Sequence, residues 1–424
     1  MYSIDYSYLR PLKAENLKKR HNAEFVKRES LAVWQGNNAV VLPLKHFSGD
    51  NSLFGRGGVV DANGEYIALS AVERRVQGKY DFEAPFHDDC RAVYCGYLVH
   101  HWGHFLVEAV ARLWYFLEND SNVDKYVFFL ESGAEREITG NYRAFFELLG
   151  VWDKIEIINR PTEYRELIVP ELGYSWCNYY SEQYKNIFEK IASNVKIDAA
   201  WEPADKIYFS RSKLGKASGL EFGLETLDDF FERNGYKILF PEQLPLSRMI
   251  YYIRNSDVCA TLSGSLPHNM LFARDGQKLI IAERLVLNNE IQVNVNAMKS
   301  LDVTYVDSHF AVYPTNMSGP FIIAFTEQLE KFAKDNGLQP PDEKYTSERH
   351  LRRCFKKYMK AYKKEYGYRW FMEDWYTKYT DYLWEAYKDA YAAFGAYLSG
   401  QKPFLLRHCF ELRYIKRLIK RIIK

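Results

Sequence analysis

The stretch that decides the fold begins with KIYFSRSK at residues 206–213 and ends with KLIIAE at residues 278–283. Between them lie two more apolar runs, KILF (237–240) and VCATL (258–262), and segments with helical spacing separate the runs. Short apolar strands that alternate with amphipathic helices are typical of a parallel, doubly wound sheet. Such sheets bind ligands at the carboxyl ends of their strands. We therefore expect an α/β fold with a site where these four runs end.

Composition narrows the class of protein. A chain of 424 residues that is 47% hydrophobic is long enough for two domains and is not disordered on a large scale. The net charge of +2 argues against a nucleic-acid binder. Six cysteines occur without a CxxC pair, which favours reduced thiols over disulfides or a zinc site. Because no signal segment and no run of 18 apolar residues occurs, we expect a cytoplasmic protein without a spanning helix.

The chain is predicted to have three parts. Residues 1–200 are expected to form an α/β domain that starts with mainly β structure, including a hairpin around Asn63-Gly64. Residues 201–337 contain the strands described above and form the second domain. The prolines at positions 340 and 341 end a helix predicted over residues 320–336, and residues 343–424 are predicted to be a helical extension.

The segment HHWGHFLVE (100–108) stands where a strand ends and a helix begins. His101 and His104 lie at this junction, and Glu108 follows His104 by one helical turn. A histidine oriented by a carboxylate is a suitable general base for a sugar hydroxyl, because its proton is exchanged near neutral pH. No HExxH or DxD element supports a metal here, and we expect none. A histidine that only caps the helix and packs in a cleft is the alternative.

Positive charge and a helix start follow the strands of the second domain. Arg211, Lys213 and Lys216 come after its first strand, and a guanidinium can bind a diphosphate in a bidentate way. A solvated basic loop is the alternative. The turn at residues 263–269 opens a helix whose free N–H groups could receive a phosphate. Glu283 ends a strand and is either an acceptor for ribose hydroxyls or an ordinary exposed strand end.

Five motifs follow one another in a fixed order. They are H-x-x-H-F-x-x-E (101–108), K-I-Y-x-S-R-S (206–212), P-E-x-L-x-L (241–246), S-D-V-x-A-x-x-S-G-S-L-x-x-N-M-L-F (256–272) and I-I-x-E (280–283). In this order they resemble glycosyltransferase family 61, over residues 90–310. The resemblance implies a GT-B-like fold, in which two Rossmann-like domains face each other across a cleft. It also implies inverting, metal-independent transfer from a nucleotide sugar to a lipid-linked or polymeric glycan in bacterial capsule or cell-surface polysaccharide synthesis.

The resemblance also suggests roles for single residues. It implies that His104 and Glu108 belong to the acceptor-side catalytic face, with His101 as the substitute. The donor-side residues that it implies are Arg211, Gly264, Ser265, Asn269 and Glu283, and we expect Lys213, Lys216 and His268 beside them. The chain differs from the family pattern in two places. A His-Gly pair is usual in the turn, where this chain has Ser263-Gly264. A second arginine and an Asn-Glu pair usually follow the S-R-S motif, and here Lys216 and either Glu221 or Glu225 are the nearest candidates.

The end of the chain, ELRYIKRLIKRIIK (411–424), has the pattern of an amphipathic helix. Its leucines and isoleucines share one face, and its lysines and arginines occupy the other. Such a helix suits the surface of an anionic membrane, so residues 412–424 are predicted to attach the protein to the inner face of the cell membrane. Packing on the protein's own body or in a homodimer is the alternative.

Two other functions stay open at this point. A transferase of another activated group, such as a polyol phosphate, differs from a glycosyltransferase in the nucleotide that it releases. A membrane-attached scaffold with a degenerate nucleotide site would bind a nucleotide without turnover.

Overall fold

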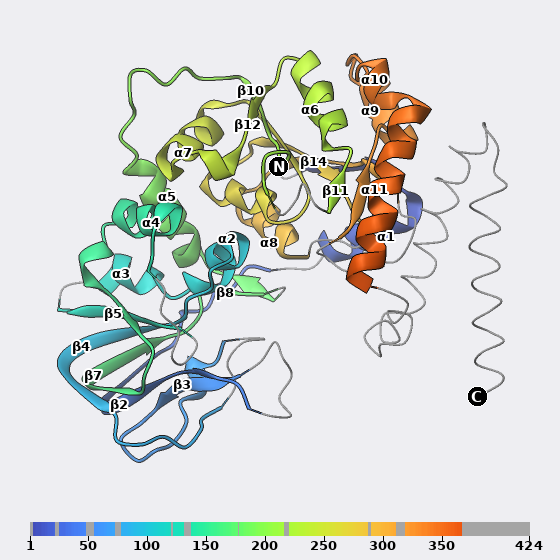
Figure 1. Cartoon of the computed structure of the whole chain (residues 1–424). Helices are drawn as coiled ribbons and strands as arrows, with labels where there is room; N and C mark the ends of the chain where they lie inside the picture. Colours follow the sequence, from blue (N-terminus) through green and yellow to red (C-terminus); the bar gives the residue numbers. More distant parts are fainter. Residues whose placement is uncertain are drawn as a thin grey trace, which may run out of the picture.

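Two six-stranded β-sheets, each packed against helices, organise the chain (Figure 1). The computed structural model describes residues 3–21, 25–47, 55–72, 78–119, 122–130, 137–176, 178–215, 220–286, 290–310 and 319–366. We call the sheet formed mainly by residues 33–170 the N-terminal sheet and the one formed mainly by residues 206–307 the C-terminal sheet. The predicted α/β class is confirmed.

The C-terminal sheet is parallel throughout. Its order is β1-β15-β14-β13-β10-β12, so the four strands predicted from residues 206–283 are present and adjacent. The strands are β1 (Ser3–Tyr8), β10 (Lys206–Phe209), β12 (Lys237–Leu239), β13 (Val258–Leu262), β14 (Lys278–Glu283) and β15 (Asp302–Asp307).

Helices cover both faces of this sheet because side chains alternate along each strand. On β10, Ile207 and Phe209 face one apolar cluster, whereas Tyr208 faces another. The first cluster includes α7 (Leu246–Asn255), η6 (Leu266–Phe272) and α8 (Glu290–Met298), and the second includes α6 (Leu224–Arg233) and α9 (Glu327–Asp335). This is the doubly wound arrangement expected from the sequence.

The first strand of the chain corrects the predicted division at residue 200. β1 pairs with β15 at the edge of the C-terminal sheet, and α1 (Pro11–His21) packs against α8. Lys13 and Arg10, which follow β1, are buried beside the carboxylates of Glu283 and Asp307. Residues 3–21 therefore belong with the C-terminal sheet, because ion pairs and strand pairing fix them there.

The N-terminal sheet is mixed rather than wholly parallel. Its order is β3-β2-β7-β4-β5-β6, with β7, β4, β5 and β6 parallel and β2 antiparallel to both of its neighbours. The predicted turn at Asn63-Gly64 follows β3, and only a single bridge, Val60 to Tyr66, continues the pairing. The strands are β2 (Val33–Lys45), β3 (Arg56–Val60), β4 (Phe86–Tyr97), β5 (Lys125–Phe129), β6 (Ile155–Ile158) and β7 (Thr162–Pro170).

Helices of the two halves share one apolar core. The rings of Phe145 on α4 (Gly140–Leu149), Phe188 on α5 (Glu182–Ser193) and Phe272 on η6 meet at centroid distances of 5.3 to 6.4 Å. One continuous cluster of buried residues runs through both halves. The remaining short elements are η1 (Ala68–Ser70), α2 (Trp102–His104), η2 (Phe105–Ala109), α3 (Trp114–Asn119), η3 (Trp152–Lys154), β8 (Tyr174–Ser175), β9 (Tyr179–Tyr180) and η5 (Pro241–Gln243). This core fixes the two sheets relative to each other.

A small sheet and two helices complete the described chain. β17 (Phe321–Ile323) pairs with β11 (Glu221–Phe222) and β16 (His309–Phe310), so the first part of the helix predicted over residues 320–336 is a strand. The helices α10 (Glu343–Thr346) and α11 (Glu348–Tyr366) follow, and α11 packs on this sheet (Figure 1). The predicted membrane helix at residues 412–424 lies outside the described residues. None of the described helices combines the length and apolar character that crossing a membrane requires.

Candidate functional site

The predicted histidine and glutamate pair is formed at the junction of the two halves. His104 ends α2, and Glu108 lies in η2, the π-helical segment that follows. The distance from His104 Nδ1 to Glu108 Oε1 is 2.7 Å. A carboxylate at Nδ1 fixes the proton there and leaves Nε2 as the basic nitrogen. π-Helical turns occur frequently at functional sites, and this one brings the two side chains together.

Across from this pair lies η6 of the C-terminal half. Trp102 Nε1 donates a hydrogen bond of 2.8 Å to Asn269 Oδ1. Gly103 packs so closely that a Cβ atom there would lie 2.8 Å from Ser265 Oγ and 3.2 Å from a ring carbon of His268. The glycine therefore permits a backbone approach that a side chain would prevent. The start of α2 and the predicted turn at residues 263–269 form one site.

Asn269 makes hydrogen bonds within the protein. It is fully buried, its Oδ1 accepts from Trp102, and its Nδ2 donates to the carbonyl of Leu266. The donor-binding role of Asn269 therefore stays a prediction. Its side chain ties α2 to η6, a contact between distant segments that local sequence does not reveal.

His268 is a third histidine at this junction. Its Nδ1 lies 2.8 Å from Gln292 Oε1, and the chain of hydrogen bonds continues from Gln292 to Asn296 and from Asn296 to Tyr305. Burial lowers the pKa of His268 to about 4, and the nearby rings of His104 and His101 act in the same direction. His268 is therefore neutral at pH 7 and supplies no positive charge to an anion.

The lowered pKa of His268 predicts a loss of stability in weak acid. In the unfolded chain His268 is protonated near pH 6.5, and in the folded chain only near pH 4. The stability that neutral His268 contributes is therefore fully present above pH 6.5 and is lost as the pH falls towards 4. Between pH 7 and pH 5 the loss amounts to about 2 kcal/mol. We expect the free energy of unfolding of His268→Asn, measured with urea, to fall by that much less than the parent's over the same pH range. An equal decline in the variant and the parent would contradict the assignment.

Two arginines share one glutamate beside the predicted turn. Arg211 Nε lies 2.9 Å from Glu221 Oε2, and Arg284 pairs with the other oxygen of the same carboxylate. Burial lowers the pKa of both arginines, and the charge of Arg211 adds to the effect on Arg284. Two cations thus share one anion, and an incoming phosphate would relieve the repulsion between them.

Gly264 brings the predicted turn onto this group. It has a φ of +127°, and a Cβ atom there would lie 2.6 Å from Arg284 Nη2. Ser263, which replaces the usual histidine, accepts a hydrogen bond of 3.1 Å from the Arg284 backbone N–H. The turn and Arg284 are therefore held against each other. The sequence patterns did not predict Arg284 as a site residue, although it directly follows the predicted Glu283.

Glu283 itself points elsewhere. It is 2% exposed, and Lys13 Nζ donates a hydrogen bond of 2.8 Å to its Oε2. A lysine from the start of the chain thus pairs with the carboxylate, and the predicted ribose contact of Glu283 stays a prediction. Lys213 is exposed, with its ammonium 3.9 Å from the centre of the Phe240 ring, and Lys216 lies outside the described residues.

Comparison with known proteins decides the family. A family model described as Glycosyltransferase 61 matches residues 102–280. Residues 102–280 belong to glycosyltransferase family 61. The resemblance inferred from the order of motifs is confirmed over these residues, and it supports a glycosyltransferase. No curated protein matches the chain.

The family 61 region contains most of the site but not all of it. It begins at the first residue of α2 and includes His104, Glu108, Arg211, Glu221 and the turn before η6. Lys13 and Arg284 lie outside the matched residues. Arg284, which directly follows β14, places a second arginine beside Arg211 on the same glutamate.

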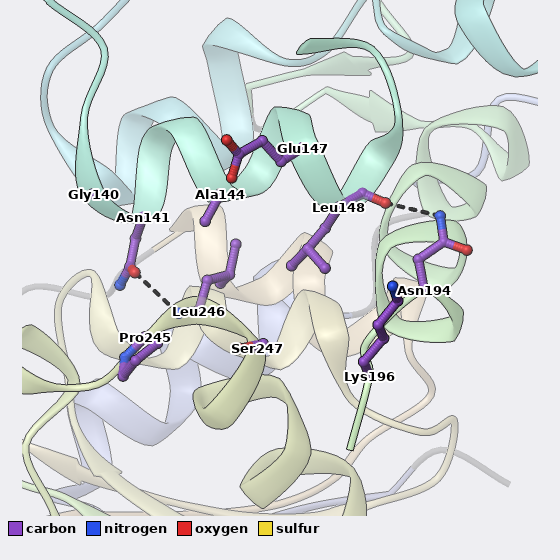
Figure 2. Close-up of a pocket in the computed structure, with 10 residues that line it drawn as sticks. All are labelled: Gly140, Asn141, Ala144, Glu147, Leu148, Asn194, Lys196, Pro245, Leu246 and Ser247. Carbon is purple, nitrogen blue, oxygen red and sulfur yellow. Dashed lines mark hydrogen bonds between the residues drawn. The ribbon is translucent and has the colours of Figure 1, made fainter. Parts of the chain in front are cut away.

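A surface hollow of about 840 Å³ lies elsewhere in the protein (Figure 2). Helices α4 and α7 form its walls, and Asn141 caps α7 by accepting a hydrogen bond of 2.9 Å from the N–H of Leu246. Its lining consists of Gly140, Asn141, Ala144, Glu147, Leu148, Asn194, Lys196, Pro245, Leu246 and Ser247. None of these is a predicted site residue or part of the histidine and arginine groups. We therefore do not place the chemistry there.

Proposed function

We propose that this chain is an inverting glycosyltransferase of GT-B-like architecture that uses a nucleotide-sugar donor. The observation that carries the proposal is the pair of arginines on one glutamate, beside the Gly264 turn and across from His104 and Glu108. Guanidinium groups bind phosphate oxygens in a bidentate way. The two halves contribute one group each, a base from α2 and an anion site from the C-terminal sheet.

The proposed reaction is a single displacement. The acceptor hydroxyl transfers its proton to His104 Nε2 while its oxygen forms a bond to the anomeric carbon of the sugar. The bond from that carbon to the diphosphate oxygen breaks, and the nucleoside diphosphate leaves with the electron pair. Arg211 and Arg284 stabilise the negative charge that develops on it. Glu108 stabilises the imidazolium that forms at His104.

The finer assignments are part of the same proposal. The guanidinium groups provide charge stabilisation at the diphosphate, so we propose a reaction without a catalytic metal there. The motif resemblance supports a glycan or lipid-linked acceptor in bacterial surface polysaccharide synthesis. Membrane attachment through residues 412–424 remains a prediction from the sequence, as does the position of the enzyme at the cytoplasmic face.

The proposal predicts that Arg211→Ala weakens nucleotide binding. A lost hydrogen bond to a charged group costs about 1.5 to 3 kcal/mol, or roughly 10- to 150-fold in affinity. A thermal-shift screen of nucleoside diphosphates first selects the ligand that raises the melting temperature. Calorimetry with that ligand then compares the parent with Arg211→Ala.

Arg143→Ala is the matched control, because Arg143 also pairs with a glutamate, at 2.7 Å from Glu147, but on α4. We expect it to bind like the parent. A folded Arg211→Ala protein with unchanged affinity would remove this arginine from the donor site. Release of a nucleoside monophosphate instead of a diphosphate during turnover would favour transfer of a group such as a polyol phosphate.

A further inference from the structure

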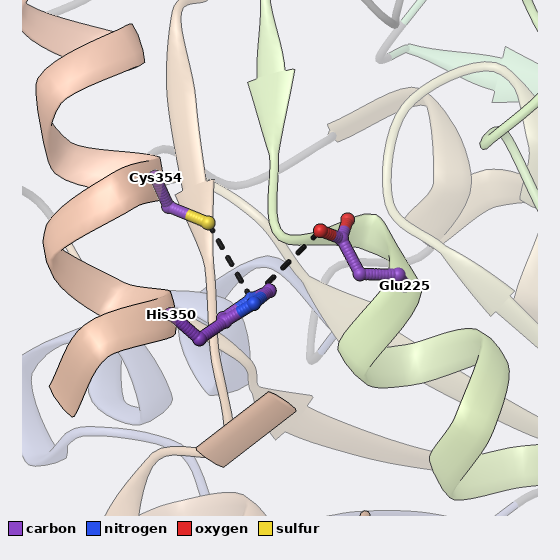
Figure 3. A group of neighbouring side chains, drawn as sticks. All are labelled: Glu225, His350 and Cys354. Atoms are coloured by element: carbon purple, nitrogen blue, oxygen red, sulfur yellow. Dashed lines mark hydrogen bonds and ion pairs between the residues drawn. The ribbon is translucent and has the colours of Figure 1, made fainter. Parts of the chain in front are cut away.

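Three metal-ligating side chains meet between α6 and α11. His350 and Cys354 come from successive turns of α11, and Glu225 comes from the first turn of α6 (Figure 3). His350 Nε2 lies 3.4 Å from Cys354 Sγ and 3.9 Å from Glu225 Oε1. All three ligand atoms lie within 4.8 Å of one another. This group lies apart from the proposed catalytic histidines and uses none of them.

The spacing of these atoms suits a small tetrahedral ion. Ligand atoms on a tetrahedral zinc lie about 3.3 to 3.7 Å apart, given bonds of about 2.0 to 2.3 Å. The distance from His350 to Cys354 already falls in this range, and a small rotation of Glu225 would bring its carboxylate into it. Glu225 is also the most exposed of the three, so it provides an entry path from solvent. Nitrogen, sulfur and carboxylate oxygen together favour zinc over magnesium or calcium.

Arg353 and Lys357 bring positive charge to the group. Arg353 Nη2 lies 2.9 Å from His350 Nδ1 and 3.7 Å from Glu225 Oε1. An ion at Nε2 requires the proton on Nδ1, so the guanidinium has to turn away. Its side chain is 59% exposed and can do so into solvent. Thr226 Oγ1, at 3.5 Å from His350 Nε2, adds a neutral oxygen on the α6 side.

We propose that Glu225, His350 and Cys354 bind a zinc ion that fastens α11 to the start of α6. A water molecule would complete the tetrahedron. The sequence predicted no zinc site because no CxxC pair occurs, but Glu225 and His350 are brought together only by folding. The ion would sit just after β11, the strand that carries Glu221. It would therefore stabilise the segment that presents Glu221 to the two arginines.

Cobalt substitution tests this proposal directly. The full-length chain is freed of metal with a chelator and titrated with Co²⁺. This ion binds in place of zinc, and its absorption spectrum depends on the residues that bind it. We expect one equivalent to give visible bands of a four-coordinate ion and a near-ultraviolet band from thiolate-to-cobalt charge transfer. Zinc should abolish both bands and raise the melting temperature of the protein.

Variants decide which residues bind the ion. Cys354→Ser should lose the charge-transfer band, and Cys259→Ser, which changes another buried cysteine, should keep it. Glu225→Gln, a change at a partly exposed position, should weaken cobalt binding but retain the thiolate band at saturation. Circular dichroism checks that the metal-free variants are folded. No charge-transfer band in the parent, or an unchanged band in Cys354→Ser, would overturn the proposal.

Discussion

Replacing His104 by alanine should lower sugar transfer by roughly 100- to 10,000-fold, the range for loss of a general base. The reason is geometric, because Glu108 holds Nδ1 at 2.7 Å and directs the basic nitrogen away from itself. The nucleotide site lies on the other half of the molecule, so nucleotide affinity should stay nearly unchanged. Initial rates with saturating donor, together with calorimetry of the same protein, measure both quantities.

The matched control for this prediction is His87→Ala. His87 also pairs with a glutamate, at 2.9 Å from Glu163, but it is exposed at the start of β4. It should transfer sugar like the parent. Glu108→Gln should retain part of the activity, since an amide still accepts a hydrogen bond from Nδ1. If His101→Ala is inactive and His104→Ala is active, the base is His101, whose ring lies 4.8 Å from that of His104.

Replacing Lys13 by methionine should reduce the free energy of unfolding by about 3 to 5 kcal/mol, because it leaves the buried Glu283 without its cation and Asp307 with Arg10 alone. Lys13 Nζ lies 2.8 Å from Glu283 and 3.4 Å from Asp307, and all three side chains are at most 3% exposed. Burial opposes ionisation of Asp307, but the charges of Lys13 and Arg10 hold its pKa below the usual value. Urea denaturation at pH 7 measures the change.

Lys19→Met on the same helix is the control for Lys13. Lys19 pairs with Glu15 at the surface, where an ion pair contributes about 0 to 1 kcal/mol. The double variant with Glu283→Gln should recover part of the stability lost in Lys13→Met, because it removes one unpaired charge. Equal urea midpoints for Lys13→Met and Lys19→Met would show that residues 3–21 are not held by this network.

Local sequence predicted the parts of the structure that depend on local patterns. The strands of residues 206–283 were predictable because each is a short apolar run between helices, and the His104 and Glu108 pair because one helical turn separates them. The location of β1 was not predictable, because the six residues of this strand do not indicate which edge of which sheet they join. Glu283 and Arg284 illustrate the same limit. Glu283 ends β14 and Arg284 directly follows it, and the pairing of Glu283 with Lys13 leaves Arg284 to face the site.

Long-range contacts also explain the other differences. The side-chain amide of Asn269 is of a type that often binds ligands, but here its oxygen accepts a hydrogen bond from the indole N–H of Trp102. The second arginine comes from a strand end 73 positions after Arg211, so no motif could contain both. The group of Glu225, His350 and Cys354 likewise spans two helices that are distant in the chain.

The central claim is that a nucleoside diphosphate binds between Arg211, Arg284 and the Gly264 turn. Hydrogen exchange of the full chain, with and without the nucleotide selected by thermal shift, tests it most directly. We predict slower exchange at residues 220–222 and 262–272 and no change at residues 140–148 and 245–247, which line the hollow of Figure 2. Protection at the hollow, with unchanged exchange at the Gly264 turn, would contradict the proposed donor site.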